Sequence, residues 1–224
     1  TSLAQTVCRC AESYHISTPL ATGLQFSLRL LVAGARPSIV AKHTFPVDRA
    51  DALDDPTRYV HCSREELLSA LDAGREATVL DLGSGTGFYT DDVAPHVGRV
   101  LGVDLQRPMH VRYRAKGAPA NVSLLTSPVE ALPLAGGVVD GAFSTMTYHE
   151  FATPAAAREL ARVCRSGARV VTVDWTSAGD GEAGPPTDER YDLAHAVETL
   201  EAAGFRTTRA ESRRETFVHV CRRV

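Results

Sequence analysis

Hydrophobic and polar positions alternate in blocks over most of the chain. From residue 77 onward, short apolar runs lie at 78–82, 99–104, 121–125, 138–145 and 168–174. Amphipathic segments of helical length separate these runs, near 88–97, 106–116, 154–165 and 188–203. Strands that alternate with helices predict right-handed crossovers and a parallel sheet with helices on both faces.

The end of the chain departs from this alternation. The sequence GFRTTRAESRRETFVHVCRR (204–223) contains two strand-like segments joined by a short polar connection. A connection this short makes a hairpin, so one of its strands runs against the rest of the sheet. We therefore predict an α/β fold with a Rossmann-like, doubly wound, mostly parallel seven-stranded sheet and an antiparallel C-terminal hairpin strand.

The first part of the chain gives a weaker pattern. Residues 42–76 are polar and helical in character, and SREELLSAL begins with Ser63 and has Glu66 three positions later. This is a capping box at the start of an amphipathic helix. Residues 1–41 lack clear periodicity. We expect an N-terminal extension at 1–41, poorly ordered or a short helix, and one domain at 42–224 that begins with a helical cover.

Composition narrows the function classes. The formal charge of −3 provides no global basic field, so we expect no nucleic-acid partner. The apolar segment 20–35 contains Arg29 and is too short to cross a bilayer comfortably, so no membrane span is expected. The five cysteines are irregularly spaced, which argues against a metal site and indicates a reducing, cytoplasmic environment. The sequence leaves the oligomeric state open.

The stretch ATVLDLGSGTGF (77–88) carries the strongest chemical signal. A strand-like run reaches Asp81, and glycines follow at 83, 85 and 87 before a helical pattern begins. A dinucleotide fingerprint requires G-x-G-x-x-G, and here the third glycine comes one residue early. Asp81 would also repel a pyrophosphate. A P-loop is excluded because G-K-[ST] is absent, and a nucleophile elbow because Leu82 stands two residues before Ser84 in place of glycine.

A second carboxylate defines the class of ligand. Asp104 ends the next apolar run, about twenty residues after the first glycine, where a carboxylate accepts hydrogen bonds from both ribose hydroxyls. Asp81 favours a positive group at the loop. The ligand should therefore carry a ribose and a cation but no pyrophosphate, and S-adenosylmethionine (SAM) has these features. The other interpretation is that both aspartates merely cap helices or turns.

With these residues in place, the sequence resembles the class I SAM-dependent methyltransferases. VLDLGSGTG and VLGVDLQ are similar to the first and second motifs of that family. SPVEALPLAGGVVDGAFSTMTYHEF resembles the segment that leads past the adenine into the fourth strand, and ELARVCRSGARVVTVDW resembles the next helix and strand. The resemblance covers 42–224 and is nearest to the UbiE-like methylases. It implies SAM as the cofactor and methyl transfer as the activity.

The resemblance also implies the cofactor-binding residues, which are Asp81, Gly83, Ser84, Gly85, Gly87, Asp104, Leu105, Ser127, Val129 and Ser144. One position departs from the family. The acidic residue that bonds the adenine amino group is replaced by Pro128, which offers neither a side-chain acceptor nor an N–H. We expect the Ser127 side chain or the Val129 N–H to hold the adenine, with Glu130 as the substitute if the alignment shifts by a residue or two.

The acceptor should meet the cofactor beyond the fourth strand, at STMTYHEF. His149 is the candidate general base because its ordinary pKa suits neutral pH. The other interpretation is a histidine that fixes the loop. Glu150 could orient His149 only by reaching back. Tyr148 and Trp175 could frame a flat acceptor or simply pack in the core.

The loop sequence GPPTDER (184–190) follows the fifth strand and should lie at the same edge of the sheet. Its prolines stiffen the loop, and Asp188 is expected to cap the helix that follows. Two roles are open for Arg190. It could bind an anionic group of the acceptor, or it could tie down the loop by ion pairing.

Three functions follow from this pattern. We expect a SAM-dependent methyltransferase that acts on an unidentified small-molecule acceptor. A protein or nucleic-acid methyltransferase is an alternative, although the N/D-P-P-[YFW] motif and a basic stripe are absent. A non-catalytic module that binds SAM or S-adenosylhomocysteine (SAH) is the third, because methyl displacement requires few diagnostic side chains.

Overall fold

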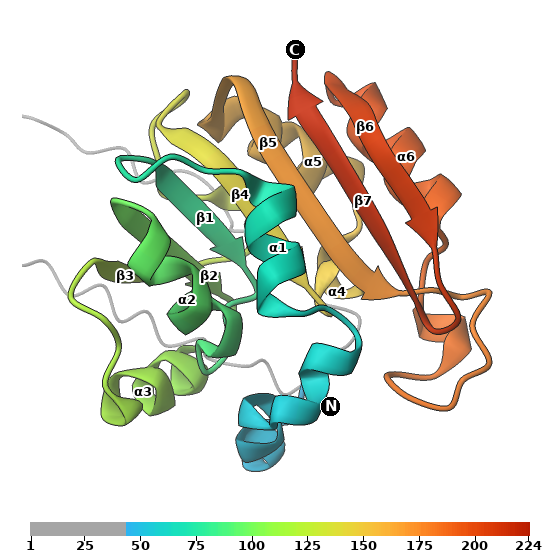
Figure 1. Ribbon diagram of the computed structural model, residues 1–224, viewed down its shortest axis with the longest axis horizontal. Helices are drawn as coiled ribbons and strands as arrows, with labels where there is room; N and C mark the ends of the chain where they lie inside the picture. The colour runs from blue at the N-terminus through green and yellow to red at the C-terminus, as the bar shows by residue number, and fades with distance from the viewer. Residues whose placement is uncertain (1–43) are drawn as a thin grey trace, which may run out of the picture. The chain divides into compact units, whose positions relative to one another are not determined.

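The computed structural model describes residues 44–224, so the expected extension at 1–41 lies outside the described residues. Seven strands form one sheet in the order β3-β2-β1-β4-β5-β7-β6 (Figure 1). Their bounds are Thr78–Leu82 (β1), Arg99–Asp104 (β2), Val122–Thr126 (β3), Val139–Thr145 (β4), Cys164–Trp175 (β5), Phe205–Ser212 (β6) and Thr216–Arg223 (β7).

The α-helices are α1 (Arg64–Leu71), α2 (Phe88–Val93), α3 (Arg107–Lys116), α4 (Tyr148–Phe151), α5 (Pro154–Val163) and α6 (Leu193–Ala202). Five 3-10 helices accompany them: η1 (Val47–Asp54), η2 (Pro56–Val60), η3 (Ala94–His96), η4 (Val129–Ala131) and η5 (Thr187–Glu189). No helix in residues 44–224 combines the length and the apolar character needed to cross a membrane.

The direction of each strand follows from its pairing. β1 pairs in parallel with both β2 and β4, and the parallel pairing extends to β3 on one side and β5 on the other. β7 pairs antiparallel with both β5 and β6. The predicted Rossmann-like, doubly wound sheet with an antiparallel strand from a C-terminal hairpin is therefore confirmed. The strand order reverses between β1 and β4, and such a switch point leaves a crevice at the carboxyl ends of the strands.

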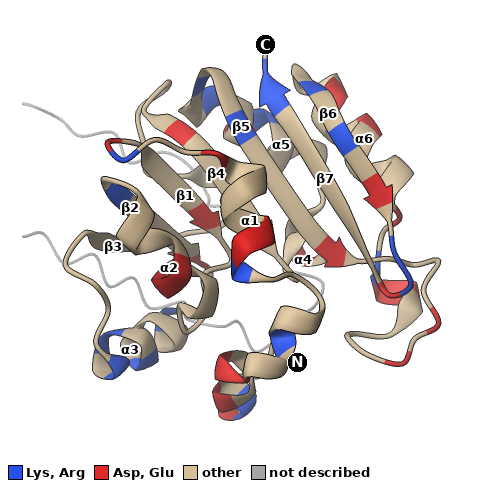
Figure 2. Cartoon of the chain, in the orientation of Figure 1, with Lys and Arg blue, Asp and Glu red and all other residues tan. Residues whose placement is uncertain are grey.

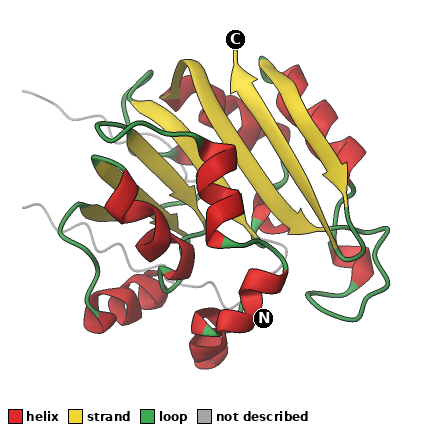
Figure 3. Ribbon diagram, viewed as in Figure 1, coloured by secondary structure: helices red, strands yellow, loops and turns green. Residues whose placement is uncertain are grey.

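Helices lie on both faces of the sheet (Figure 3). Neighbouring strand residues point to opposite faces, so Val79 joins the core beneath α1 and α2 while Leu80 joins the core beneath α5 and α6. Leu67 of α1 belongs to the first core, and Leu160 of α5 to the second. The hydrophobic alternation of the sequence is thus divided between two layers.

Two predicted boundaries differ from the structure. β5 begins at Cys164 rather than 168, and it shortens the predicted helix because Cys164 adopts an extended conformation. The helix expected at 188–203 is divided into η5 and α6. Asp192 caps α6 by accepting a hydrogen bond from the His195 N–H at 2.8 Å, so the expected cap at Asp188 is wrong.

The residues before β1 form the helices η1, η2 and α1. Ser63 caps α1 as predicted, accepting a hydrogen bond from the Glu66 N–H at 3.1 Å. The other half of the capping box differs, because the Glu66 carboxylate contacts Arg209 and Arg213 of the C-terminal hairpin. The Glu66 carboxylate therefore belongs to an ion-pair network with the C-terminal hairpin and does not complete the capping box.

The basic residues of α3, visible in Figure 2, hold η1 in place. Arg112 pairs with Asp51 at 2.8 Å, and Lys116 pairs with Asp54 at 2.9 Å. These side chains are a third or more exposed, so each pair contributes at most about 1 kcal/mol. Together they set η1 beside the carboxyl ends of the strands.

Candidate active site

A cavity of about 890 Å³ lies at the switch point of the sheet. Its floor contains residues from the carboxyl ends of β1, β2, β4 and β5, and acidic residues mark the arrowheads of β1 and β5 in Figure 2. Residues of η1, η2 and the loop 184–191 line the remaining walls. Of the predicted site residues, those that line the cavity are Asp81, Gly83, Ser84, Gly85, Asp104, Leu105, Ser127, Val129, His149 and Glu150.

The glycines after β1 serve the packing of the protein itself. Gly83 has φ +78°, and a Cβ there would lie 2.2 Å from the Thr147 side chain. Gly87 has φ +86°, and a Cβ there would lie 2.1 Å from the ring of Tyr113. Gly87 does not line the cavity, so its assignment as a cofactor-binding residue stays a prediction. Gly83 and Gly87 therefore each allow a protein side chain to approach closely, and Gly83 also lines the cavity.

Ser84 lines the cavity, and its side chain is held by a buried histidine. Its hydroxyl lies 3.2 Å from Nε2 of the fully buried His110, whose Nδ1 lies 3.2 Å from the Thr126 hydroxyl. Burial lowers the pKa of His110 to about 4, so the ring is neutral at physiological pH. The glycine loop is therefore linked to β3 by an uncharged hydrogen-bonded bridge.

Asp81 is a buried carboxylate at the end of β1. It is 2% exposed and accepts a hydrogen bond from the Thr90 hydroxyl at 2.5 Å. Burial raises the pKa of Asp81 to about 7, against the effect of that hydrogen bond. No ion pair with Asp81 is formed within residues 44–224. A cationic ligand group in the cavity would stabilise the ionised form.

Asp104 is held in place by the backbone of the loops around it. Its Oδ2 accepts from the Gly85 N–H at 2.9 Å, and its Oδ1 accepts from the Gln106 N–H at 2.7 Å. Burial raises the pKa of Asp104, while these two hydrogen bonds oppose the shift. Each carboxylate oxygen retains a second lone pair for a ligand hydroxyl.

Arg58 of η2 lies in the same part of the cavity, although no sequence signal pointed to it. Its guanidinium lies 5.4 Å and 5.5 Å from the ring centroids of Phe88 and Tyr89, and it donates to the Leu53 carbonyl at 3.0 Å. Its Nε is buried and has no hydrogen-bond partner in the described structure. Asp81 acts electrostatically on Arg58. The two residues therefore offer opposite charges to one ligand.

The adenine end departs from the usual pattern, as expected from Pro128. The Ser127 hydroxyl donates to the Ala131 carbonyl at 2.7 Å, and Glu130 accepts from the Thr153 hydroxyl at 3.3 Å. Val129 is the first residue of η4, where an N–H has no partner within the helix. Of the candidates for the adenine contact, the Val129 N–H is the group that has no hydrogen-bond partner among residues 44–224.

His149 lies at the other end of the cavity, against the end of β5. Its Nδ1 is 3.0 Å from both carboxylate oxygens of Asp174, and its backbone N–H donates to Oδ2 of Asp174 at 2.5 Å. Burial alone would lower the pKa of His149, but the hydrogen bond and charge of Asp174 outweigh burial and raise it. Asp174, not Glu150, orients the imidazole.

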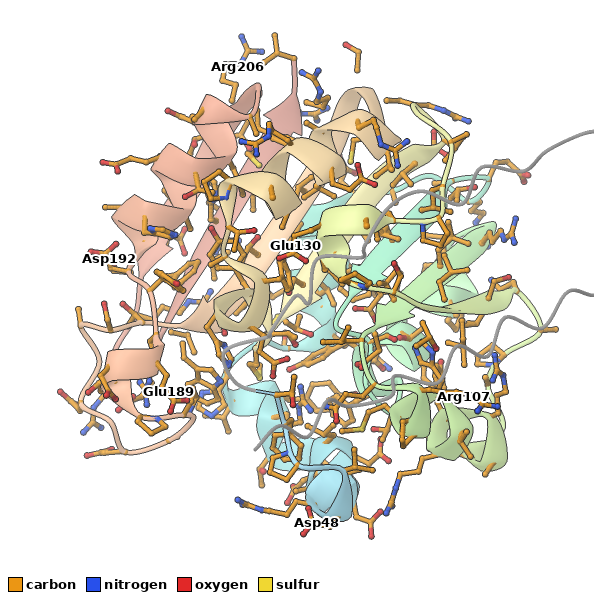
Figure 4. All side chains as sticks on the ribbon, turned by 180° about the vertical axis from the view of Figure 1, so that it is seen from behind. Asp48, Arg107, Glu130, Glu189, Asp192 and Arg206 are labelled. Carbon is orange, nitrogen blue, oxygen red and sulfur yellow. The ribbon has the colours of Figure 1, made fainter. Side chains whose placement is uncertain are left out.

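Glu150 lines the cavity next to His149 and has a separate environment. Burial raises the pKa of Glu150 to about 7, while the neighbouring His149 opposes that shift. Figure 4 labels two further carboxylates, Glu189 of η5 on the acceptor side and Glu130 of η4 on the adenine side. Both line the cavity. The acceptor end is therefore rich in acidic side chains.

Besides Gly87, two predicted residues do not line the cavity. Tyr148 is 4% exposed and packs against Phe151 and Phe217, with ring centroids 5.6 Å and 6.4 Å away. Ser144 is 2% exposed and lies in the core beside Tyr148. Tyr148 thus packs in the core, the second of the two roles expected for it, and the cofactor role of Ser144 stays a prediction without support from the cavity lining. Thr145 and Met146 line the cavity at the end of β4 instead.

Trp175 and Arg190 form the wall beyond His149. The Arg190 guanidinium lies 5.6 Å from the centroid of the Trp175 ring, donates to the Pro185 carbonyl at 2.8 Å and pairs with Glu215 at 3.1 Å. Its side chain is 1% exposed. Arg190 therefore ties down the loop, which decides between the two roles expected for it, and Trp175 faces the cavity with His61 at 4.5 Å between ring centroids.

Comparison with known proteins identifies the family. Residues 80–172 match a family model described as a methyltransferase domain. The crystal structure of a SAM-dependent methyltransferase from Aquifex aeolicus is similar at 30% sequence identity and a TM-score of 0.75, covering 81% of this chain and all of that one. The chain belongs to the SAM-dependent methyltransferases.

The curated relatives match about half of this methyltransferase. An uncharacterized protein of Mycobacterium tuberculosis is 34% identical over 117 residues, which are 50% of this chain and 42% of that protein. The biotin biosynthesis bifunctional protein BioHC of Cellvibrio japonicus is 34% identical over 106 residues, 46% of this chain and 21% of that protein. The chain thus spans less than half of either relative. The nearer resemblance to UbiE-like methylases stays a prediction.

The cavity of this methyltransferase fits SAM chemically. Asp104 offers carboxylate oxygens for ribose hydroxyls, and Val129 offers an N–H for the adenine. Asp81 and Arg58 match the ammonium and carboxylate of the amino-acid end. When bound, SAM supplies a methyl group activated on a sulfonium. Asp81 and Asp104 were predicted from their spacing to the glycines, whereas Arg58 and Asp174 gave no such signal.

Proposed function

We propose that this methyltransferase transfers the methyl group of SAM to a small-molecule acceptor bound beside His149. The observation that carries the proposal is the division of one cavity into two chemically different ends. One end presents Asp81, Arg58 and Asp104 around the glycine loop. The other end presents His149, Glu150 and Trp175, which are not needed to bind any group of SAM.

The size of the whole cavity and the charge of the residues that line it support a small molecule over a polymer. The cavity of about 890 Å³ is within the range of roughly 300–1,000 Å³ that is usual for small-ligand sites. Glu130, Glu150 and Glu189 line it, and carboxylates repel the phosphates of a nucleic acid. The three cysteines in the described residues are free thiols, which agrees with a reaction in the reducing cytoplasm.

The test combines binding with transfer. Purified protein is titrated with SAM and SAH by calorimetry, and is then incubated with methyl-labelled SAM and a cell extract separated into dialysable, protein and nucleic-acid fractions. We expect label in dialysable products that separate from SAM by chromatography, and much less of it with the Asp104→Ala variant at a limiting SAM concentration. Label in the protein or nucleic-acid fraction would contradict the small-molecule acceptor. Binding without any transfer would favour a non-catalytic SAM or SAH module.

A further inference from the structure

We propose that His149 and Asp174 form a proton-accepting dyad, and that the methyl acceptor is a neutral molecule whose attacking atom carries a proton. This inference rests on the proposed function and deepens it, because it restricts the class of acceptor. A hydroxyl or an acidic carbon fits this description. A carboxylate or a nucleophile without a proton does not.

The dyad is built from two adjacent strands. Thr145 at the end of β4 pairs with Val173 of β5, so the residue after Val173 meets the turn that follows β4. Asp174 occupies that position, and it accepts the backbone N–H of His149 at 2.5 Å as well as contacting its ring. The carboxylate therefore fixes both the main chain and the side chain of His149.

This contact determines which ring nitrogen faces the acceptor. A carboxylate accepts hydrogen bonds, so the Nδ1 atom 3.0 Å away carries the proton. Nε2 then holds the lone pair. It has no hydrogen-bond partner within residues 44–224, and the His149 side chain, 9% exposed, lines the cavity. A base with its lone pair in the cavity and its other nitrogen held by a buried carboxylate is the arrangement of an oriented general base.

The charged groups around His149 favour the same state. Asp174 on β5, Glu150 on α4 and Glu189 on η5 all act to raise the pKa of His149. An imidazolium formed by proton transfer is therefore stabilised from three elements. The same carboxylates repel an anionic acceptor, which would need no base.

The balanced step uses only the residues named and the two reactants. As the acceptor atom forms its bond to the methyl carbon, the S–CH₃ bond breaks and its electron pair remains on sulfur. The acceptor's proton passes to Nε2 of His149, and Asp174 stabilises the positive ring. The imidazolium later returns the proton to water.

The first experiment needs no acceptor. NMR of ¹⁵N-labelled histidine in the full chain, with the His149 signals assigned by their loss in His149→Gln, reports the tautomer and the titration. We expect the Nδ1–H form and a pKa above the ordinary value. In Asp174→Asn, we expect the pKa of His149 to fall by about one unit or more. A His149 protonated on Nε2, or an unchanged titration in Asp174→Asn, would overturn the dyad.

The second experiment measures the rate at which label passes from SAM to dialysable products that are separated from SAM. His149→Gln should lower the rate by about 10²–10⁴-fold, and the wild-type pH–rate profile should have an ascending limb that this variant lacks. His96→Gln, an exposed site outside the cavity, is the matched control and should retain the wild-type rate. Wild-type transfer by His149→Gln, or a product methylated on a carboxylate, would overturn the inference.

The failure of the proposed function is distinguishable from the failure of the dyad. If SAM does not bind in calorimetry, or if the wild-type protein transfers no label to any fraction, the proposed function fails, and the NMR titration still decides whether Asp174 controls His149. If SAM binds and transfer occurs with an unaffected His149→Gln variant, methyl transfer stands and only the dyad is lost.

Discussion

Asp81 lines one end of the cavity and Asp174 lies behind His149 at the other end, and the two carboxylates differ in how many hydrogen bonds the protein gives them. Asp174 accepts hydrogen bonds from the backbone of His149 and of Trp175, and it contacts the His149 ring. Asp81 accepts one hydrogen bond, from the Thr90 hydroxyl. Burial raises the pKa of Asp81 to about 7. Asp174 is thus held by several hydrogen bonds from the protein, whereas Asp81 has one hydroxyl partner and favours a cationic ligand group.

The largest effect on SAM affinity should come from removing the charge of Asp81. Asp81→Asn should weaken SAM binding by about 2–4 kcal/mol, roughly 30- to 1000-fold, because the ammonium loses a buried counter-charge. The same variant should make the unliganded protein more stable. Folding raises the pKa of Asp81. Its contribution to the free energy of unfolding therefore falls as the pH rises from about 4 to about 7.

Calorimetry and thermal unfolding at pH 5 and pH 8 check both signs. We expect the melting temperature of unliganded Asp81→Asn to exceed that of the wild type at pH 8, and to approach it at pH 5. Thr90→Val is the matched control, since it removes the hydroxyl partner of Asp81 but keeps the charge. If Asp81→Asn binds SAM as the wild type does, the ammonium assignment is wrong.

A slightly smaller effect is expected at the end of β2. Asp104→Ala should reduce SAM affinity by about 1.5–3 kcal/mol, through loss of the charge-assisted ribose contact. Asp104 also accepts the N–H groups of Gly85 and Gln106, so Asp104→Asn is needed as a control that keeps one acceptor oxygen. Wild-type affinity in a folded Asp104→Ala variant, measured by calorimetry, would rule out the ribose assignment.

The pH dependence of binding should sharpen the contrast. SAM pairs with ionised Asp81, so below about pH 7 a proton must leave before the cofactor binds. We expect affinity to fall as the pH drops from 7 to 6, by up to about tenfold per unit. Asp81→Asn should flatten this dependence, whereas Asp174→Asn should preserve it. A profile that Asp174→Asn flattens and Asp81→Asn does not would reverse the roles of the two ends.

The smallest effect on the cofactor should follow a change in the acceptor wall. Gly184 has φ +84°, and a Cβ there would lie 2.4 Å from the Trp175 ring, so Gly184→Ala should displace the indole. Trp175 is the chain's single tryptophan, and its fluorescence reports the displacement directly. SAM affinity should stay within about twofold, because the two ends are separate. A large loss of SAM affinity would show that they are coupled.

The sequence predicts the cofactor end better than the acceptor end for a physical reason. Asp81 and Asp104 terminate parallel strands next to a glycine loop, and that local pattern fixes their position. The pairing of His149 with Asp174 joins residues 25 positions apart, and it depends on which strand lies beside β4. A single sequence gives the existence of strands more readily than their order.

Side-chain direction within a short helix was the other limit. Tyr148 and His149 are neighbours at the start of α4, and adjacent helical residues point about 100° apart. Their positions in the sequence therefore do not decide which of them faces the cavity. The packing of Tyr148 against Phe217 of β7 decides the matter, and this contact belongs to the C-terminal hairpin, far along the chain.

The backbone at Met146 has a consequence for attempts to engineer this protein. Met146 has φ 57°, a left-handed conformation that glycine adopts more easily, and its Sδ lies 3.8 Å from Nη2 of Arg58. Replacement by glycine would relieve roughly 1 kcal/mol of backbone strain and remove the thioether beside the guanidinium. Met146 also packs against the core beneath α1 and α2, so the lost burial opposes that gain, and variants at this position should be screened for cofactor affinity as well as for stability.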